Sequence, residues 1–307
     1  MRVLVTGGAG FIGSHLVETL LERGHEVTVL DNLVTGKKRN LEDVLDRIDF
    51  VQGDILDDEN IRDALEGAEA VAHLAGLIGA EKTLEESVKK QNLFRLANAV
   101  GTLKLLQHSS TMGVRNFVFT SSGIVYGEPF RLPIAESDPV QPTSAYSESK
   151  LEAENYCENF INNARLHVTV FRLFNTYGPR QVPCPYSDIM MHFAENAIWG
   201  KFRIPGDGGQ TRDFVYVKDA ADILSAALEK GIVGLYNLGS GRAVTFKQLA
   251  ETMAAVTGRS NPKFENKDSP KGEIRNSMAD ITKMVTAFGI KPATPLEEGL
   301  KATLKRR

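Results

Sequence analysis

The chain has 307 residues, which suggests about two domains, or one large α/β domain with an extension. It carries 36 Lys and Arg against 39 Asp and Glu, and a net charge of −3 gives no reason to expect nucleic acid or an anionic membrane as a partner. A hydrophobic content of 42 % with 24 % charged residues excludes wholesale disorder.

The sequence also argues against a disulfide-rich protein, a metalloprotein and a membrane-spanning protein. Cys157 and Cys184 are too few for a disulfide scaffold, and no His, Cys or acidic residues have the spacing of a metal site. No apolar run approaches the ~18–20 residues of a membrane helix. A strand-like run begins at Val3, so we expect a cytoplasmic protein without a signal peptide.

The first half of the chain alternates short apolar runs with helical patterns. We expect strands at residues 3–5, 27–30, 50–51, 70–74, 117–120 and 168–171, and helices at residues 11–23, 61–65, 93–107 and 146–161. Strands that alternate with helices predict a parallel sheet covered on both faces. The predicted fold class is therefore α/β, a doubly wound (Rossmann) sheet whose ligands bind at the carboxyl ends of the strands.

After about residue 174 the alternation weakens, prolines become frequent, and a smaller C-terminal lobe that binds the substrate is expected. We place a dinucleotide-binding domain in residues 1–173, with residues 211–236 returning to it. The remaining residues, 174–210 and 237–307, form the predicted substrate lobe, with a helix at about residues 245–257.

A glycine-rich turn follows the first predicted strand. Gly8, Gly10 and Gly13 satisfy G-x-G-x-x-G, and Gly7 precedes them. Glycines let the backbone approach a pyrophosphate, and the following helix presents free N–H groups to it. Asp31 lies 18 residues after Gly13, where a carboxylate accepts hydrogen bonds from ribose hydroxyls and repels the extra phosphate of NADP. The pattern predicts NAD.

Three residues further along predict catalysis. Tyr146 and Lys150 lie four apart and share one face of a predicted helix. A tyrosine with a pKa near 10 is a poor base at pH 7, and a neighbouring ammonium group lowers that pKa. Ser122 follows the fifth predicted strand, where its hydroxyl can share a hydrogen bond with a substrate oxygen. We therefore predict Ser122, Tyr146 and Lys150 as the catalytic residues.

With these motifs the sequence resembles the extended short-chain dehydrogenase/reductase family, in its NAD-dependent nucleotide-sugar 4-epimerase branch. The matching stretches are VTGGAGFIGSHL near the start, DN at 31–32, GDI at 53–55, HLAG at 73–76, NAVGT at 98–102, SSGIVYG at 121–127, YSESK at 146–150, RLFNTYGPR at 172–180 and RDFVYVKD at 212–219. They run across nearly the whole chain.

The resemblance implies which residues hold a tightly bound NAD and a UDP-sugar. The cofactor residues would be Gly7, Gly10, Phe11, Ile12, Gly13, Asp31, Asn32, Thr35, Gly36, Asp54, Ile55, Leu74, Ala75, Gly76, Asn98, Tyr146, Lys150 and Phe174. The substrate residues would be Ser122, Tyr146, Asn175, Arg212, Arg275 and Ser277. The guanidinium of Arg212 suits a diphosphate, and its alternative role is a surface salt bridge with Asp213.

The reaction implied is a redox-neutral inversion at C4 of the sugar. Tyr146 would take the proton of the 4-hydroxyl while C4 gives a hydride to NAD, and the transient 4-keto sugar would rotate before NADH returns the hydride. Related dehydratases and decarboxylases carry acidic residues after the Ser or Thr, where this chain has Gly123 and Ile124, which transfer no proton.

We therefore expect a UDP-hexose 4-epimerase. The alternatives left open are a 4-epimerase for UDP-glucuronic acid or an activated deoxysugar, an NAD(H)-linked 4-ketoreductase, and a non-catalytic NAD-sensing module. A sugar that carries a carboxylate would need an extra cation, which Arg275 could supply.

Departures from the family pattern concern the sugar. A tyrosine at the position of Ser277 excludes 2-N-acetyl sugars in some relatives, so Ser277 favours a pocket for UDP-N-acetylglucosamine as well as UDP-glucose. The usual second diphosphate-binding arginine is replaced by Pro270, and Lys271 or Arg275 could act instead. Residues 77–90 do not match the typical epimerase loop.

The resemblance also implies a homodimer paired through the helices near residues 93–107 and 146–161. Ala97, Leu103 and Leu106 could supply its apolar face, or could belong to the core.

Overall fold

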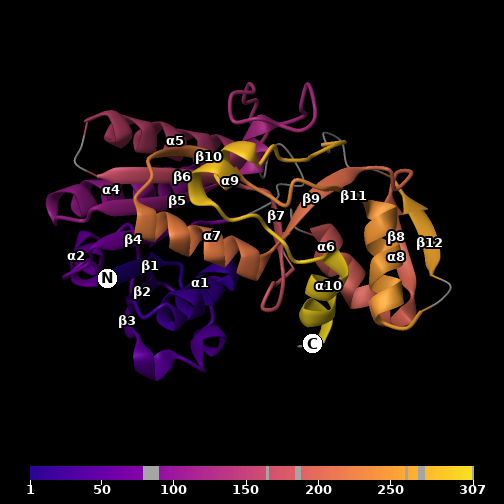
Figure 1. The fold of residues 1–307 in the computed structure, drawn as a ribbon, viewed down its shortest axis with the longest axis horizontal. Helices are drawn as coiled ribbons and strands as arrows, with labels where there is room; N and C mark the ends of the chain where they lie inside the picture. The colour runs from indigo at the N-terminus through magenta and orange to yellow at the C-terminus, as the bar shows by residue number, and fades with distance from the viewer. Residues whose placement is uncertain (79–89, 164–165, 184–187, 260–261, 269–273, 306–307) are drawn as a thin grey trace.

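A seven-stranded parallel sheet forms the centre of the protein, in a computed structural model that describes residues 1–78, 90–163, 166–183, 188–259, 262–268 and 274–305. Across the sheet its strands are β10 (Gly234–Leu238), β6 (His167–Leu173), β5 (Asn116–Ser122), β4 (Ala70–His73), β1 (Arg2–Thr6), β2 (Glu26–Asp31) and β3 (Asp49–Gln52). All the carboxyl ends therefore lie along one edge, and the predicted doubly wound α/β class is confirmed (Figure 1).

Helices cover both faces of this sheet (Figure 1). One face carries α1 (Phe11–Glu22), α7 (Val217–Lys230) and α9 (Thr282–Phe288). The other carries α2 (Asp58–Ala64), α4 (Gly101–Thr111) with the π-helical turn η3 (Arg95–Val100) before it, and α5 (Ala145–Asn163). Short 3-10 helices are η1 (Lys38–Leu41), η2 (Leu45–Arg47), η4 (Gly123–Tyr126) and η5 (Ala197–Trp199).

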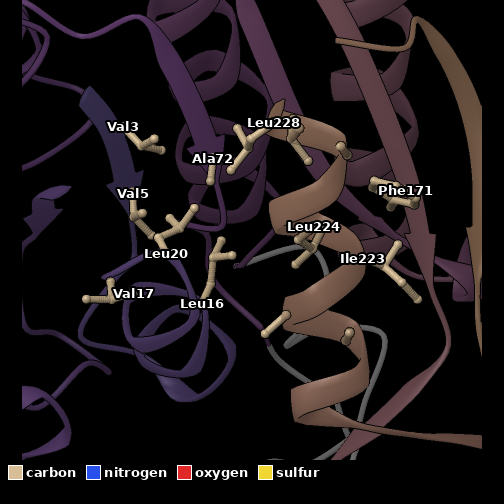
Figure 2. Packing of buried hydrophobic residues seen from close by; sticks show 14 of the residues in the cluster. Val3, Val5, Leu16, Val17, Leu20, Ala72, Phe171, Ile223, Leu224 and Leu228 are labelled. Atoms are coloured by element: carbon tan, nitrogen blue, oxygen red, sulfur yellow. The ribbon is translucent and has the colours of Figure 1, made fainter. Parts of the chain in front are cut away.

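The alternation of side chains along the strands decides which face each residue covers. Figure 2 shows Val3 and Val5 of β1 pointing to the layer that contains Leu16 of α1 and Leu224 of α7. Leu4, between the two valines, lies in the core on the other face. Each fully buried Leu or Val stabilises the fold by about 1.5–3 kcal/mol, so both faces hold the sheet rigid behind its carboxyl edge.

A smaller lobe lies beside this edge (Figure 1). It contains a sheet of β11 (Ala243–Thr245), β9 (Thr211–Tyr216) and β7 (Asn175–Tyr177), the pair β8 (Lys201–Pro205) and β12 (Lys263–Lys267), and the helices α6 (Asp188–Asn196), α8 (Phe246–Val256) and α10 (Leu296–Lys305). Phe11 and Ile12 at the start of α1 pack against the core of this lobe, so the cofactor turn touches both parts of the protein.

Part of residues 211–236 lies outside the large sheet. These residues were expected to return to the dinucleotide-binding domain, but the first six form β9, which pairs with β7 and β11. The return begins with α7, and β10 extends to Leu238. On the helix expected at residues 93–107, the dimer face and the core were both left open for Leu106, and the structure places it in the buried core. Leu93 and Leu96 on the same stretch are exposed.

No helix in the described ranges is long and apolar enough to cross a membrane.

Candidate active site

The glycine-rich turn between β1 and α1 has no room for side chains. Gly7 adopts a φ of +71°, and a Cβ there would lie 2.7 Å from the backbone nitrogen of Ala75. A Cβ on Gly13 would lie 2.2 Å from the carbonyl oxygen of Gly7. Gly10 is the N-cap of α1, whose first turn has no acidic residue and no side-chain cap. The turn therefore fits a pyrophosphate, which would accept hydrogen bonds from the helix N–H groups.

The carboxylate of Asp31 is held rigidly at the end of β2. Its two oxygens accept hydrogen bonds from the backbone N–H groups of Ala9 (3.0 Å) and Leu33 (2.8 Å). A Cβ on Gly36 would lie 2.6 Å from Oδ1 of Asp31, so this loop also closes on the carboxylate. Burial raises the pKa of Asp31, and the two N–H donors favour its ionised form.

A second carboxylate lies at the neighbouring strand end. Asn32 Nδ2 donates to Asp54 Oδ2 at 2.9 Å, and Leu56 N donates to Asp54 Oδ1 at 2.9 Å. Ile55 is buried in the core, and Thr35 is exposed. Two carboxylates at this corner favour ribose hydroxyls and disfavour a 2′-phosphate, so the geometry suits NAD rather than NADP.

The end of β4 is fixed against the glycine turn. Leu74 N donates to Thr6 O at 3.1 Å, and Ala75 N donates to Thr6 Oγ1 at 3.3 Å. The His73 ring bridges Thr6 Oγ1 (2.7 Å) and Thr102 Oγ1 (2.8 Å). Burial lowers the pKa of His73 to about 3, so this histidine is neutral and structural.

The three predicted catalytic residues come from β5 and α5. Ser122 is the last residue of β5 and is partly exposed. Tyr146 and Lys150 are buried one turn apart on α5, which packs on β5. Lys150 Nζ donates to the carbonyl oxygen of Thr120 at 3.0 Å, two residues before Ser122. Burial lowers the pKa of Lys150 to about 8, so at pH 7 it remains mostly an ammonium group beside the tyrosine.

Asn98, expected to line the path to the nicotinamide, lies in the π-helical turn with its amide bound to the protein. Its Oδ1 accepts from Leu77 N (2.7 Å), and its Nδ2 donates to Leu77 O (3.0 Å) and to Ser149 Oγ (2.9 Å). Ser149 in turn donates to Tyr146 O at 2.7 Å. A Cβ on Gly76 would lie 2.7 Å from Asn98 Oδ1. Asn98 therefore joins the loop after β4 to the helical turn that carries Tyr146.

The two positions after Ser122 are packed by apolar groups. A Cβ on Gly123 would lie 3.2 Å from the ring of Phe174, which is buried at the end of β6. Ile124 packs against a cluster that contains Phe94 and Tyr146, and these two rings meet edge to face at 6.1 Å. No acid or base stands at either position beside the tyrosine.

Arg212 lies on β9 in the smaller lobe. Its Nη1 donates to Thr211 O at 2.8 Å, and its guanidinium lies over the Phe246 ring at 5.1 Å. Asn175 opens β7, the parallel neighbour of β9. Both predicted diphosphate ligands therefore lie in one small sheet.

Asp213, the residue after Arg212, is fully buried and joins three segments of the lobe. Its carboxylate accepts from the backbone N–H groups of Ser240 (2.6 Å), Gly241 (3.0 Å) and Ala279 (3.0 Å), and from Ser240 Oγ (2.6 Å). Successive side chains of a strand point to opposite faces, so Asp213 is directed inward and Arg212 away from it. From the sequence, Asp213 was expected only as a possible surface partner of Arg212, because Ser240, Gly241 and Ala279 are distant in sequence.

The segment that begins at residue 274 carries two predicted substrate residues. Arg275 Nη2 pairs with Asp207 Oδ2 at 2.8 Å near the surface, and this pairing lowers the pKa of Asp207 to about 2. The Arg275 backbone N–H donates to Glu128 at 2.6 Å. Ser277 is partly buried two residues later. Pro270, Lys271, Cys184 and residues 79–89 of the unmatched loop lie outside the described residues.

A second buried acid was also missed. Glu154 of α5 pairs with Arg172 of β6 beneath the catalytic residues. Arg172 itself could have indicated this pair in the sequence, because it is a charged residue in an otherwise apolar strand end and needs a buried partner. Among the described residues, no three His, Cys, Asp or Glu side chains gather into a group that could hold a metal ion.

Comparison with known proteins gives consistent matches. A model of the NAD dependent epimerase/dehydratase family matches residues 3–239. A putative UDP-glucose 4-epimerase of Methanocaldococcus jannaschii is 35 % identical over 97 % of this chain and 96 % of its own. A UDP-N-acetyl-alpha-D-glucosaminuronate decarboxylase of Bacillus cytotoxicus is 34 % identical over 99 % of this chain and 97 % of its own. The crystal structure of the Thermotoga maritima UDP-glucose 4-epimerase with UDP-glucose has a TM-score of 0.90 and 37 % identity, and covers 100 % of this chain and 98 % of that one.

Proposed function

The chain belongs to the NAD-dependent epimerase/dehydratase family, and within it we propose a UDP-hexose 4-epimerase that acts on UDP-glucose, UDP-galactose and UDP-N-acetylhexosamines. One observation carries the proposal. Tyr146 and Lys150 lie buried against the end of β5, beside positions 123 and 124 that offer no second acid or base. Such a site supports proton removal from one hydroxyl and little else.

Tyr146, Lys150 and Ser122 have different roles at C4 of the sugar. When bound, NAD supplies the acceptor for the C4 hydride and later its source. The Tyr146 phenolate takes the proton of the 4-hydroxyl, so the C4–O bond becomes a carbonyl, and the same phenol returns the proton when the hydride comes back. Lys150 stabilises the phenolate by its charge, and Ser122 holds the reacting oxygen by a hydrogen bond. Inversion requires the 4-keto sugar to present its opposite face between the two transfers.

Elimination of water or loss of CO2 fits the site less well. Elimination needs a further acid and base, and Gly123 and Ile124 supply neither, with Phe174 in contact range of any side chain at 123. Decarboxylation acts on a sugar carboxylate, and Arg275, the candidate cation for it, pairs near the surface with Asp207, whose carboxylate offsets its charge. This pairing favours a neutral hexose over UDP-glucuronic acid.

The finer choice of sugar rests on Ser277. The segment that carries it is held by Asp213 at Ala279 and by the backbone pair between Ile134 and Met278 at 2.8 Å. Because this segment is fixed and the Ser277 side chain is small, the space beside Ser277 stays open, and an N-acetyl group could occupy it.

The test is direct. The purified protein is incubated separately with UDP-glucose, UDP-N-acetylglucosamine and UDP-glucuronic acid without added NAD, and the products are separated by anion exchange and assigned by NMR. We expect C4 epimers of the first two. Tyr146→Phe should lose nearly all turnover, whereas Tyr156→Phe is the matched control, because Tyr156 lies on the same helix and donates to Glu152 near the surface.

Other outcomes would identify the alternatives. Release of CO2 or a dehydrated sugar would replace the epimerase with a decarboxylase or a dehydratase. Turnover that requires added NADH would indicate a 4-ketoreductase. Bound NAD with no turnover, unaffected by Tyr146→Phe, would indicate an NAD-sensing module.

We also propose a homodimer. Leu93 and Leu96 are exposed on the helix that precedes α4, at 56 % and 45 % of their surface, and the Arg95–Glu152 pair joins this helix to α5. Paired helices would cover both leucines. Light scattering that gives a mass of 33.7 kDa, the mass of one chain, would refute the dimer.

A further inference from the structure

A buried ion pair lies beside the catalytic lysine, and no step described so far uses it. Glu154 lies on α5, one turn after Lys150, and Arg172 lies on β6. Arg172 Nε donates to both carboxylate oxygens at 3.1 Å, and its Nη2 donates to Oε2 at 2.7 Å. The two side chains are only 7 % and 6 % exposed, and a buried pair of this kind is costly to assemble. The cost of burying this ion pair next to the site suggests that the pair has a role there.

The pair is also attached to the catalytic strand. Ser121 Oγ donates to Glu154 Oε1, and Ser121 directly precedes Ser122. One residue earlier, the carbonyl oxygen of Thr120 accepts from Lys150 Nζ at 3.0 Å. Lys150 and Glu154, four residues apart on one face of α5, thus bind consecutive residues of β5. These two attachments fix the position of the helix along the strand that ends at Ser122.

We propose that Glu154 is a positioning residue for catalysis, whose carboxylate supplies the buried negative charge that balances the Lys150 ammonium and holds α5 against the end of β5. The inference rests on the proposed roles of Tyr146 and Lys150. It assigns Glu154 no contact with substrate or cofactor.

On α5, Glu154 and Cys157 influence the charge of Lys150, and Tyr146 lies one turn before it. Burial raises the pKa of the Cys157 thiol, which is therefore uncharged at neutral pH. Burial lowers the pKa of Lys150, and Glu154 is the larger of the two influences that oppose this effect. Glu154 therefore favours the charged lysine that the Tyr146 phenolate needs.

Groups on the neighbouring strands add no competing negative charge to this balance. His73 of β4 is neutral, because burial lowers its pKa to about 3. Arg172 of β6 is positive and lies 4.7 Å from the Tyr126 ring centroid, and Tyr126 donates to Asn237 at 2.7 Å. Without Glu154, the buried guanidinium of Arg172 would lose its carboxylate partner.

A pKa of about 8 keeps Lys150 mostly protonated at pH 7. Loss of one nearby opposite charge lowers a lysine pKa by about one unit or more, which would leave less of Lys150 charged at pH 7. The alkaline limb of the kcat profile would move to lower pH by the same amount.

The experiment uses charge-changing variants of the full-length protein with its NAD. The pKa of Lys150 is measured by NMR of protein labelled with 13C-lysine, assigned by comparison with Lys150→Met, and kcat is measured against pH in parallel. We expect Glu154→Gln to lower the Lys150 pKa and the alkaline limb by about one unit. Arg172→Met breaks the same ion pair but keeps the carboxylate, so it should leave the Lys150 pKa unchanged or raise it.

Two further variants separate charge from contact. Glu154→Asp retains the charge and should keep the Lys150 pKa close to that of the wild type, even if Glu154→Gln folds poorly. Glu152→Gln is the matched control, because it removes a carboxylate from the same helix where it pairs with Arg95 at the surface. Two results would overturn the proposal: a Lys150 pKa that moves equally and in one direction in Glu154→Gln, Glu154→Asp and Arg172→Met, or one that does not move in Glu154→Gln.

The NMR measurement needs no turnover, so it is independent of the proposed reaction. If the wild type converts no UDP-hexose but Glu154→Gln still lowers the Lys150 pKa, the epimerase assignment fails and the positioning role stands. If the wild type is an epimerase and the pKa does not move, the positioning role fails alone.

Discussion

Replacement of Gly13 by alanine should separate cofactor binding from fold stability. The added methyl carbon would lie 2.2 Å from the carbonyl oxygen of Gly7 and 2.8 Å from Cα of Gly8. Ordinary contacts begin at about 3.4 Å, so either the start of α1 or the glycine turn must move by about 1 Å. Because both neighbours are backbone atoms in a packed turn, no side chain can rotate away.

This displacement acts on two quantities. Overpacking of a tight site costs about 1–3 kcal/mol of the free energy of unfolding. The N–H groups at the start of α1 would also lose their alignment on the pyrophosphate, and a loss of about 1.4 kcal/mol or more of binding free energy lowers NAD affinity at least about tenfold. We therefore expect Gly13→Ala to contain less NAD per chain than the wild type and, once stripped, to bind NAD at least about tenfold more weakly.

Gly24→Ala is the matched control. Gly24 has a φ of +78°, and a Cβ there meets nothing within 4 Å. The left-handed conformation costs alanine about 1–2 kcal/mol, at the far end of α1 from the turn. NAD content per chain, NAD titration of stripped protein and urea unfolding are measured for both variants. If Gly13→Ala retains NAD as well as Gly24→Ala at equal stability, the glycine turn is not where the pyrophosphate binds.

Three other substitutions test the site. Because burial lowers the pKa of Lys150 from 10.5 to about 8, the unfolded chain binds this proton more tightly, and the lysine opposes folding fully below pH 8 and not above about 10.5. The stability of Lys150→Met relative to the wild type should therefore fall by up to about 3 kcal/mol between pH 7 and about pH 10.5, and a stability difference that does not change with pH would contradict the assignment. Asp213→Asn should lose about 3 kcal/mol of stability, because the amide NH2 would face backbone N–H groups whose hydrogen bonds the carboxylate accepts. It should also raise the KM for the UDP-sugar without changing NAD content, and loss of NAD would count against this role. Ser277→Tyr should abolish turnover of UDP-N-acetylglucosamine and spare UDP-glucose, and equal rates for both sugars would dismiss Ser277 as the determinant.

The large sheet and the glycine turn could be predicted because their signals are local. The short apolar runs at residues 3–5 and 27–30 are buried strands, and Gly24 ends α1 as its position suggests. Asp31 stands at the end of β2, where an acid beside the cofactor was expected.

The smaller lobe could not be predicted in the same way. β7 and β11 have three residues each, which is too short for a periodic pattern, and β9 resembles a strand of the large sheet until its pairing is known. Arg275 and Asp207 lie 68 positions apart, so their pairing could not be predicted from the sequence. Arg275 was therefore expected to be available to bind the substrate.

Buried charges were missed for a related reason. Asp213 reads as a surface partner of its neighbour Arg212, and only the three-dimensional structure brings Ser240 and Ala279 to it. Glu154 was not singled out from the sequence, because its partner Arg172 lies on β6 and not on the same helix. Long-range pairing, which no local pattern encodes, determines both roles.

The fate of the hydrogen on C4 tests most directly whether the protein inverts C4 by hydride transfer to its bound NAD. The protein as purified is incubated with UDP-glucose deuterated at C4, without added NAD, and the product is analysed by NMR and mass spectrometry. Tyr146 exchanges only the oxygen-bound proton with water, so the UDP-galactose formed should keep its deuterium at C4. A C4 epimer with the deuterium replaced by hydrogen from water, or the absence of any C4 epimer, would contradict it.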